Sequence, residues 1–433
     1  MDTLCSQAFG ASQTSRMGTY SLTGVAVVSV VFLFSGVLVW HASYILVALG
    51  QPAEVSSLAG DFIRYLLPGV LFLNIYKLIQ KVSQSRNEAG PMLITAMVTN
   101  AVNLGLGYYL VHCTTWGWMG AAVARTVANF VTVPTVLLCM VIGSGNSGEY
   151  DDSADPPRND NERKTQRYLE VDVGDRTDNE DDIVKDDSEF LRQIWEGFIV
   201  SEALRYSAIM EFLRIGVPGM LQVMFEWVAF EVLALLCGIL PGHEAIVGIG
   251  AHSIIMQISS LTWTLYQGVS VSGNVRVGNA LGAGDVHRAE IASNLTLASG
   301  FFTSVVNVAL LLTFRNSLPW LFTSDLDIVR KTHRLILIAV AFQFPDSINC
   351  SVQGIFRGSG RQALAAKYNF IAFYVIGIPL AYILGVRLGF GVEGLWWGIT
   401  SGLFAIAIGG TIAILRSDWR KLASEAALRI NDD

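Results

Sequence analysis

The sequence predicts an all-α membrane protein with about ten transmembrane helices in two homologous bundles. Of its 433 residues, 52% are hydrophobic and 15% are charged, and the mean hydropathy is +0.47. Soluble domains carry about 25% charged residues, so this composition indicates a chain that lies mostly in lipid. The apolar residues form long stretches without the alternating pattern of barrel strands, which predicts helices.

Ten apolar stretches supply the expected membrane spans. Crossing the hydrocarbon core takes about 20 residues of helix. The expected spans are approximately residues 20–40, 62–80, 91–112, 118–142, 214–240, 245–272, 290–314, 332–356, 364–386 and 392–415. Lipid offers no partner for backbone N–H and C=O groups, so each stretch has to pair them internally as a helix.

Basic residues in the connections predict the orientation in the membrane. One set of alternate short connections is rich in lysine and arginine, and the opposite set is poor in them. The rich set holds Arg16, Lys81, Arg86, Arg276, Arg288, Arg357, Arg361, Lys367, Arg416, Arg420, Lys421 and Arg429. The poor set holds Arg315, Arg330, Lys331 and Arg387. The positive-inside rule places the rich set in the cytoplasm.

An internal repeat divides the chain into two halves. LCSQAFGAS near the start matches RVGNALGAG at an offset of about 272, QKVSQSRNEAGP matches QGIFRGSGRQ at about 273, and GWMG matches GVEG at about 274. Two homologous bundles are a common plan among secondary transporters. We expect an N-terminal lobe at residues 1–142, an acidic cytoplasmic linker at 143–211, a C-terminal lobe at 212–415 and a cytoplasmic tail at 416–433.

The linker and the start of the chain carry two further expectations. Residues 143–211 are highly charged and poor in aromatic residues, which predicts a disordered linker, with a regulatory role as the alternative. The repeat offset leaves residues 214–272 without a counterpart in the first half. We therefore expect that two helices are missing, either because the reading frame starts at an internal methionine, the interpretation we favour, or because the protein is a ten-helix variant.

Two acids stand out in the apolar run FEWVAFEV. A carboxylate at the bilayer centre costs about 2.5 to 3.5 kcal/mol on insertion scales, so an intramembrane acid indicates a functional site. Counting from Arg214, Glu226 is expected near the midplane and Glu231 nearer the outer face. They lie about 140° apart on a helix, too far to bind one ion together. Glu226 is predicted to exchange a proton; the alternative for both acids is hydrogen bonding that serves packing.

Asp346 forms the second intramembrane acid site. Gln343, Asp346 and Asn349 follow an i, i+3, i+6 spacing and share one helix face, and Pro345 interrupts the backbone hydrogen bonds beside them. The alternative is a polar stripe that packs against other helices.

Aromatic rings attract flat cations, although they also serve as interface anchors. The cavity candidates are Gln222, Trp227, Gln257, Trp263, Tyr266, Gln343, Asn349 and Tyr374.

Several long motifs resemble the eukaryotic branch of the multidrug and toxic compound extrusion (MATE) family. They are EWVAFEVLALLCGILP, RVGNALGAGDVHRAE, GIFRGSGRQ and NFIAFYVIGIPLAYIL, together with CSQAFGA near the start. The resemblance implies twelve helices in two lobes, of which this chain supplies helices three to twelve. It implies efflux of organic cations or related metabolites in exchange for protons or sodium. Glu226 and Glu231 match family acids, and the resemblance places Asp346 across the C-lobe cavity from Glu226.

These observations lead to a specific functional prediction. We expect a proton-coupled antiporter for organic cations, drugs or metabolites, with sodium as the less favoured ion, acting as a monomer in a plasma or vacuolar-type membrane. The alternatives are an inactive fragment and a lipid flippase. No nucleophile-and-base set, P-loop, basic nucleic-acid patch or metal spacing occurs in the sequence, so we expect no enzyme activity, no cofactor, no metal and no nucleic-acid partner.

Overall fold

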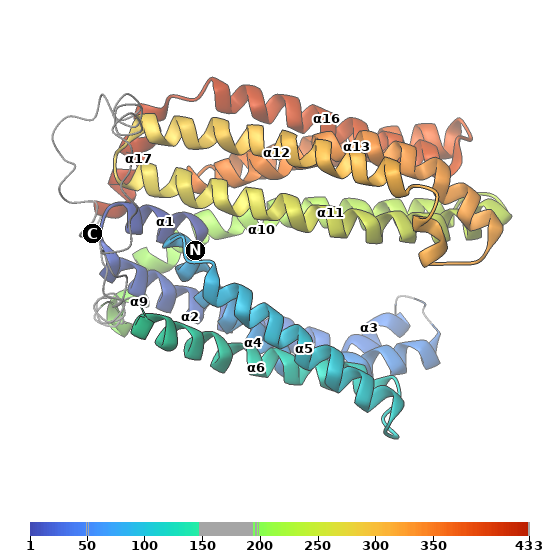
Figure 1. Cartoon of the computed structure of the whole chain (residues 1–433), viewed down its shortest axis with the longest axis horizontal. Helices are drawn as coiled ribbons and strands as arrows, with labels where there is room; N and C mark the ends of the chain where they lie inside the picture. The colour runs from blue at the N-terminus through green and yellow to red at the C-terminus, as the bar shows by residue number, and fades with distance from the viewer. Residues whose placement is uncertain (49, 51, 147–193, 195–196, 198, 432–433) are drawn as a thin grey trace, which may run out of the picture. The chain divides into compact units, whose positions relative to one another are not determined.

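The structure, a computed structural model, describes the chain except for residues 49, 51, 147–193, 195–196, 198 and 432–433. The described residues form helices joined by short connections, and no strand occurs among them (Figure 1). Within this part of the chain, ten helices are long and apolar enough to cross a membrane. The predicted fold class is therefore confirmed. The disorder predicted for the acidic linker falls mainly outside the described residues and stays a prediction.

The helices follow the expected spans closely. The first half contains α1 (Asp2–Gly10), α2 (Thr14–Trp40), α3 (Ala42–Ala48), α4 (Ala53–Ser85), α5 (Gly90–His112) and α6 (Met119–Asn146). From residue 200 onward come α9 (Val200–Ala203), α10 (Tyr206–Gly238), α11 (His243–Gly282), α12 (Val286–Phe314), η1 (Leu318–Leu321), α13 (Leu326–Gly358), α14 (Gln362–Phe370), η2 (Ile371–Gly377), α15 (Ile378–Tyr382), η3 (Ile383–Arg387), α16 (Gly391–Leu415) and α17 (Trp419–Asn431).

The chain divides into two compact units. Unit 1 comprises Met1–Gln13, Gln84–Asn87 and Leu204–Asp433, and unit 2 comprises Thr14–Ser83 and Glu88–Ala203. In unit 2, helix α5 packs along α6, and Tyr76, Met92 and Val136 form a small buried cluster. Unit 1 therefore contains most of the second half of the chain and two short segments of the first half, Met1–Gln13 and Gln84–Asn87. The division into lobes at residues 1–142 and 212–415 stays a prediction.

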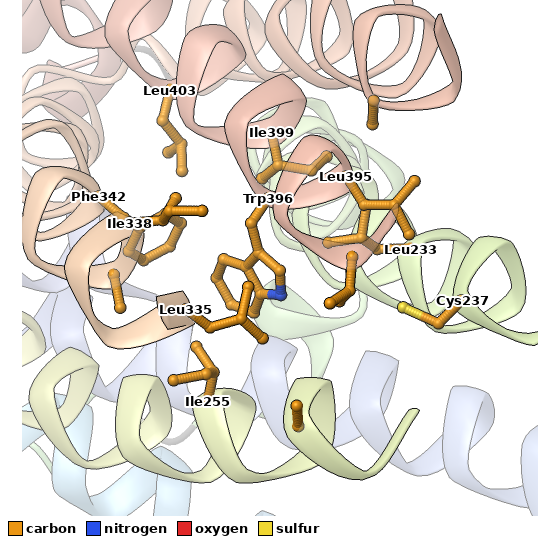
Figure 2. Close-up of a cluster of buried hydrophobic side chains, with 14 of the residues drawn as sticks. Leu233, Cys237, Ile255, Leu335, Ile338, Phe342, Leu395, Trp396, Ile399 and Leu403 are labelled. Carbon is orange, nitrogen blue, oxygen red and sulfur yellow. The ribbon is translucent and has the colours of Figure 1, made fainter. Parts of the chain in front are cut away.

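The core of unit 1 surrounds the side chain of Trp396 on α16. Trp396 is fully buried, and Figure 2 shows it among Leu335 and Phe342 of α13, Leu233 of α10 and Ile255 of α11. In a membrane protein lipid is as apolar as these side chains, so close packing rather than exclusion from water holds such helices together. Four helices are thereby fixed around one bulky residue.

Proline changes the helix type in the segment after α14. Pro379 lies in the short helix α15, and π-helical turns, η2 and η3, flank it on both sides. Because proline lacks an N–H and clashes with the preceding turn, a helix accommodates it by local rearrangement. Two widened turns of π-helix therefore accompany Pro379. Pro218 and Pro345 lie inside the α-helices α10 and α13.

An ionic cluster ties together three helices at one end of unit 1. The Nζ atom of Lys331 lies 2.5 Å from Oε1 of Glu244 and 2.9 Å from Oε2 of Glu393. These residues belong to α13, α11 and α16, and the lysine side chain is mostly buried. All three come from the second half of the chain, so the cluster fixes these helix ends to one another.

Candidate functional site

A pocket of about 200 Å³ lies among α10, α11 and α13 in unit 1. Its walls combine two acids, four aromatic rings, three hydroxyl groups and a methionine. The lining residues are Glu226, Trp227, Phe230, Met256, Ser259, Ser260, Trp263, Thr264, Phe342 and Asp346. Ligand sites of this kind are mainly apolar, with a few polar groups that determine orientation and specificity.

Glu226 reaches the pocket from the middle of α10. It is 7% exposed, and its Oε2 atom accepts a hydrogen bond of 2.9 Å from Nε2 of Gln353 on α13. The side chain of Asn369 on α14 and the positive charge of Arg357 on α13 also act on this carboxyl group. A buried carboxylate needs such partners because lipid and apolar side chains provide none. Glu226 is therefore held by donors on one side while it faces the pocket.

Asp346 reaches the same pocket from α13. It is 4% exposed and directly follows Pro345, which lies inside the helix. Glu226 is close enough to act on Asp346 through its charge. Two acids from different helices thus face one small apolar cavity, and water screens their interaction poorly there. When deprotonated, these two acids suit a proton or another cation as a partner.

Aromatic rings form the walls beside the acids. The rings of Trp227 and Trp263 meet edge to face, with centroids 6.0 Å apart and an interplanar angle of 85°. Phe230 and Phe342 form another such pair, with centroids 6.2 Å apart. Ring faces attract a positive charge within about 6 Å, so these walls suit a flat cation. The hydroxyl groups of Ser259, Ser260 and Thr264 on α11 supply polar contacts on another side.

Four of the predicted site residues line this pocket together. They are Glu226, Asp346, Trp227 and Trp263. Glu231 on α10, one of the predicted coupling acids, is exposed and does not line the pocket. Gln257 on α11 is also exposed and does not line the pocket. The angular separation expected for Glu226 and Glu231 explains why the two acids do not meet. Roles for Glu231 and Gln257 stay predictions.

The remaining cavity candidates lie near the pocket without lining it. Tyr266 is fully buried, and its hydroxyl group donates a hydrogen bond of 2.6 Å to Oε1 of Gln343. Gln222 and Asn349 are also fully buried. Tyr374 stacks on Phe370, with centroids 5.6 Å apart. These contacts fit roles in packing and positioning, and direct contact with cargo stays a prediction for them.

Sequence reasoning missed the partners of Glu226, Gln353 and Arg357, and six of the residues that line the pocket. These six are Phe230, Met256, Ser259, Ser260, Thr264 and Phe342. Ser259, Ser260 and Thr264 gave no signal because hydroxyl side chains are common in membrane helices. Gln353 was a detectable case: it lies seven residues after Asp346, which places the two on the same face of a helix. Arg357 follows four residues later on that face. A count of polar residues along this face would have found the donor that holds Glu226.

A family model identifies the chain. The model of the MatE family matches residues 1–109 and 218–383, which together make up more than half of the sequence. The chain belongs to the MatE family. The expected resemblance is confirmed, and this member is a multi-pass membrane protein. The two matched ranges contain α1 and every residue that lines the pocket.

Relatives and solved structures support this assignment. "Multidrug and toxin extrusion protein 2" of Oryctolagus cuniculus is 27% identical over 425 residues, which cover 98% of this chain and 62% of the rabbit protein. "Protein DETOXIFICATION 16" of Arabidopsis thaliana is 26% identical, covering 99% and 78%. This MatE chain therefore spans about three fifths of the rabbit protein and about four fifths of the plant protein.

The fold matches MATE transporters of known structure. The eukaryotic MATE transporter AtDTX14 has a TM-score of 0.81 and 25% identity, covering 99% of this chain and 85% of that chain. A mutant of the Vibrio cholerae MATE transporter VcmN has a TM-score of 0.72 at 16% identity, covering 100% and 84%. At that identity, the bacterial structure supports the fold alone.

Proposed function

We propose that this protein is a secondary antiporter that exports organic cations, drugs or related metabolites in exchange for protons. The observation that carries the proposal is the pocket in which two buried acids, Glu226 and Asp346, meet aromatic walls. The acids supply negative charge for a cation, and the rings supply a flat apolar surface. A proton and a cation compete for the same carboxyl groups, which is the chemistry of exchange.

The proposed cycle follows from this competition. When Glu226 is deprotonated, the pocket is negatively charged and binds cargo from the cytoplasm. When a proton from the outer side reaches Glu226, the attraction for the cation is lost and the cargo leaves. Asp346 shares the pocket and supports the same exchange. We propose that Glu231, nearer the outer face, is a third acid that supports it. The pocket and its acids then open to one side at a time, as in other transporters built from repeats.

The names of the relatives agree with this proposal. The rabbit protein is named for the extrusion of multiple drugs and toxins, and the plant protein is named for detoxification. We extend that activity class to this chain because the family model covers its pocket helices. We propose that the protein acts as a monomer in a plasma or vacuolar-type membrane, without enzymatic activity.

Transport in vesicles tests the proposed function. The purified chain is reconstituted into liposomes, and an imposed pH gradient drives movement of a fluorescent organic cation. We expect cation movement against the proton flow that is absent from protein-free liposomes and from liposomes treated with a protonophore. A sodium gradient at constant pH serves as the comparison. Movement driven only by sodium contradicts proton coupling, and absence of movement under either gradient contradicts transport.

Gln353→Leu is expected to slow this exchange about five- to tenfold. The substitution removes the amide that donates to Glu226 and keeps a side chain of similar size, so the negatively charged state of the pocket loses one of its hydrogen bonds. The initial rate of cation movement under a fixed pH gradient measures the effect. Asn294→Leu changes an exposed amide on α12 and serves as the matched control. Equal rates for Gln353→Leu and wild type would show that this hydrogen bond has no role in coupling.

A further inference from the structure

Helix α1 is embedded in one end of unit 1, beside α11, α13 and α17 (Figure 1). The positive-inside rule assigns this end to the cytoplasm. Although α1 has only nine residues, six of them are buried: Thr3, Leu4, Cys5, Ser6, Gln7 and Ala8. Three of these side chains carry polar groups, which is unusual for a buried packing surface.

Two amide side chains make equivalent hydrogen bonds in this region. Nε2 of Gln7 donates to the carbonyl oxygen of Gly358 at 2.9 Å, and Nδ2 of Asn279 donates to the carbonyl oxygen of Ser85 at 3.1 Å. The internal repeat places Gln7 over Asn279 at an offset of 272, and Ser85 over Gly358 at 273. Each amide therefore bonds to the helix end of the other repeat. We call this pair of contacts the amide clasp.

Two glycines beside the clasp are related by the same repeat offset. A Cβ atom on Gly10 would collide with the backbone of Asn279, and a Cβ atom on Gly282 would collide with the backbone of Gln7. Gly10 and Gly282 are again 272 residues apart. The contact is thus reciprocal, with the same surface used twice, as at the interface of a two-fold symmetric dimer. Two such backbones can approach only because both positions lack a side chain.

We propose that the amide clasp, whose residues all lie within unit 1, belongs to the cytoplasmic gate of this transporter and forms when that gate closes. The inference extends the proposed function, because a gate is meaningful only if the chain transports. Alternating access requires one end of the molecule to close while the other opens, and the motion follows the relation between the repeats. The clasp lies between segments of the two repeats. The Lys331 cluster, in contrast, joins helices of the second half only and can remain intact throughout the cycle.

The chemistry of the clasp suits a contact that opens repeatedly. The amide and carbonyl groups that pair when the clasp is closed can bond to water when it is open, so opening leaves neither group without a partner. A hydrophobic seal of the same area would expose apolar surface to water instead. The packed glycines make the closed state well defined, because any displacement loses many close contacts at once.

The two arms of the clasp differ in strength. Nη1 of Arg429 on the C-terminal helix α17 donates to Oε1 of Gln7 at 2.8 Å, so the amide of Gln7 has a partner on each side. The matching Oδ1 atom of Asn279 is buried and has no hydrogen-bond partner among the described residues. We therefore expect Gln7 to contribute more than Asn279 to the closed state.

Accessibility of Cys5 tests the proposal directly. Cys5 is fully buried in α1, and a variant that retains it as the single cysteine reports whether α1 leaves its site. The rate of labelling by a membrane-impermeant maleimide is measured in vesicles with the cytoplasmic face outward. Relative to the single-cysteine parent, we expect Asn279→Ala to raise the rate about fivefold and Gln7→Ala about tenfold. The two residues belong to one contact, so their effects do not simply multiply, and we expect the double variant to exceed either single variant.

Two further variants make the test decisive. Asn294→Ala removes an exposed amide on α12 and should leave the labelling rate of Cys5 unchanged. Gly282→Leu blocks the close approach by steric conflict and should raise the rate at least as much as the double variant. If Gly282→Leu and the double variant, eluting as folded monodisperse protein, both keep Cys5 protected at the parent rate, the gate assignment is overturned. The readout does not need cargo, so it is independent of whether the proposed transport is observed.

Discussion

Glu226→Gln is expected to abolish cation movement driven by a pH gradient, lowering the rate at least about 100-fold, while the chain still folds and inserts. Glutamine keeps the size of the side chain and can hydrogen-bond to Gln353, but it neither releases a proton nor carries a negative charge. The pocket then resembles its permanently protonated state. Without alternation between the two charge states, cargo and protons no longer compete for the same group, and exchange stops.

The vesicle assay with a fluorescent cation measures this loss, and detergent gel filtration with proteolysis checks folding. Glu290→Gln is the matched control, because Glu290 is an exposed acid on α12 and lies outside the pocket. It should retain the wild-type rate. Glu231→Gln determines whether the exposed acid on α10 contributes as well. Cation movement by Glu226→Gln at the wild-type rate would disprove the role of Glu226 as the coupling group.

The sequence predicts the helices of this fold because the information for them is local. Each span is a continuous apolar stretch, and its length alone determines that it can cross the bilayer. Glu226 and Asp346 were identifiable for a related reason: a single charge in an apolar run is rare and costly. Their shared pocket, however, depends on how α10 and α13 are rotated relative to each other, which no single stretch encodes.

The failures of prediction within the site have the same origin. The lining residues of α11, Met256, Ser259, Ser260, Trp263 and Thr264, follow the i, i+3, i+4, i+7, i+8 spacing of one helix face. Gln257 was a reasonable candidate by polarity, yet it lies about 100° away from Met256 and is exposed. Residue type suggested Gln257, and helix rotation excluded it from the pocket. Rotation depends on packing among distant segments, such as that around Trp396, which no local sequence pattern reveals.

The repeat offset was visible in the sequence, but its structural meaning was not. The matches around Gly10 and Gly282 indicated duplication, and duplication alone does not require that equivalent residues touch. Only the positions of Gln7 and Asn279 in the structure show that the two copies meet through the same surface. A related sequence pattern could equally arise from two copies that never approach each other.

Trp396→Ala is expected to destabilise unit 1 by about 3 to 5 kcal/mol, because it leaves a cavity that its neighbours cannot fill. Trp396 is fully buried, and its ring lies 5.5 Å from that of Phe342 and 5.7 Å from that of His252, between centroids. Helices in a membrane gain their stability from such packing, so a void is as harmful there as in a soluble core. The melting temperature in detergent should fall by about 10 °C.

The next residue of the chain supplies the control for this prediction. Trp397 is 44% exposed on the same helix, and Trp397→Ala removes an identical side chain without opening a cavity in the core. It should lower the melting temperature by less than about 3 °C. Trp396→Ala should in addition weaken cation binding, because Phe230 and Phe342 line the pocket and both pack against Trp396. Equal melting temperatures for the two variants would show that Trp396 does not organise the packing of α10, α11, α13 and α16.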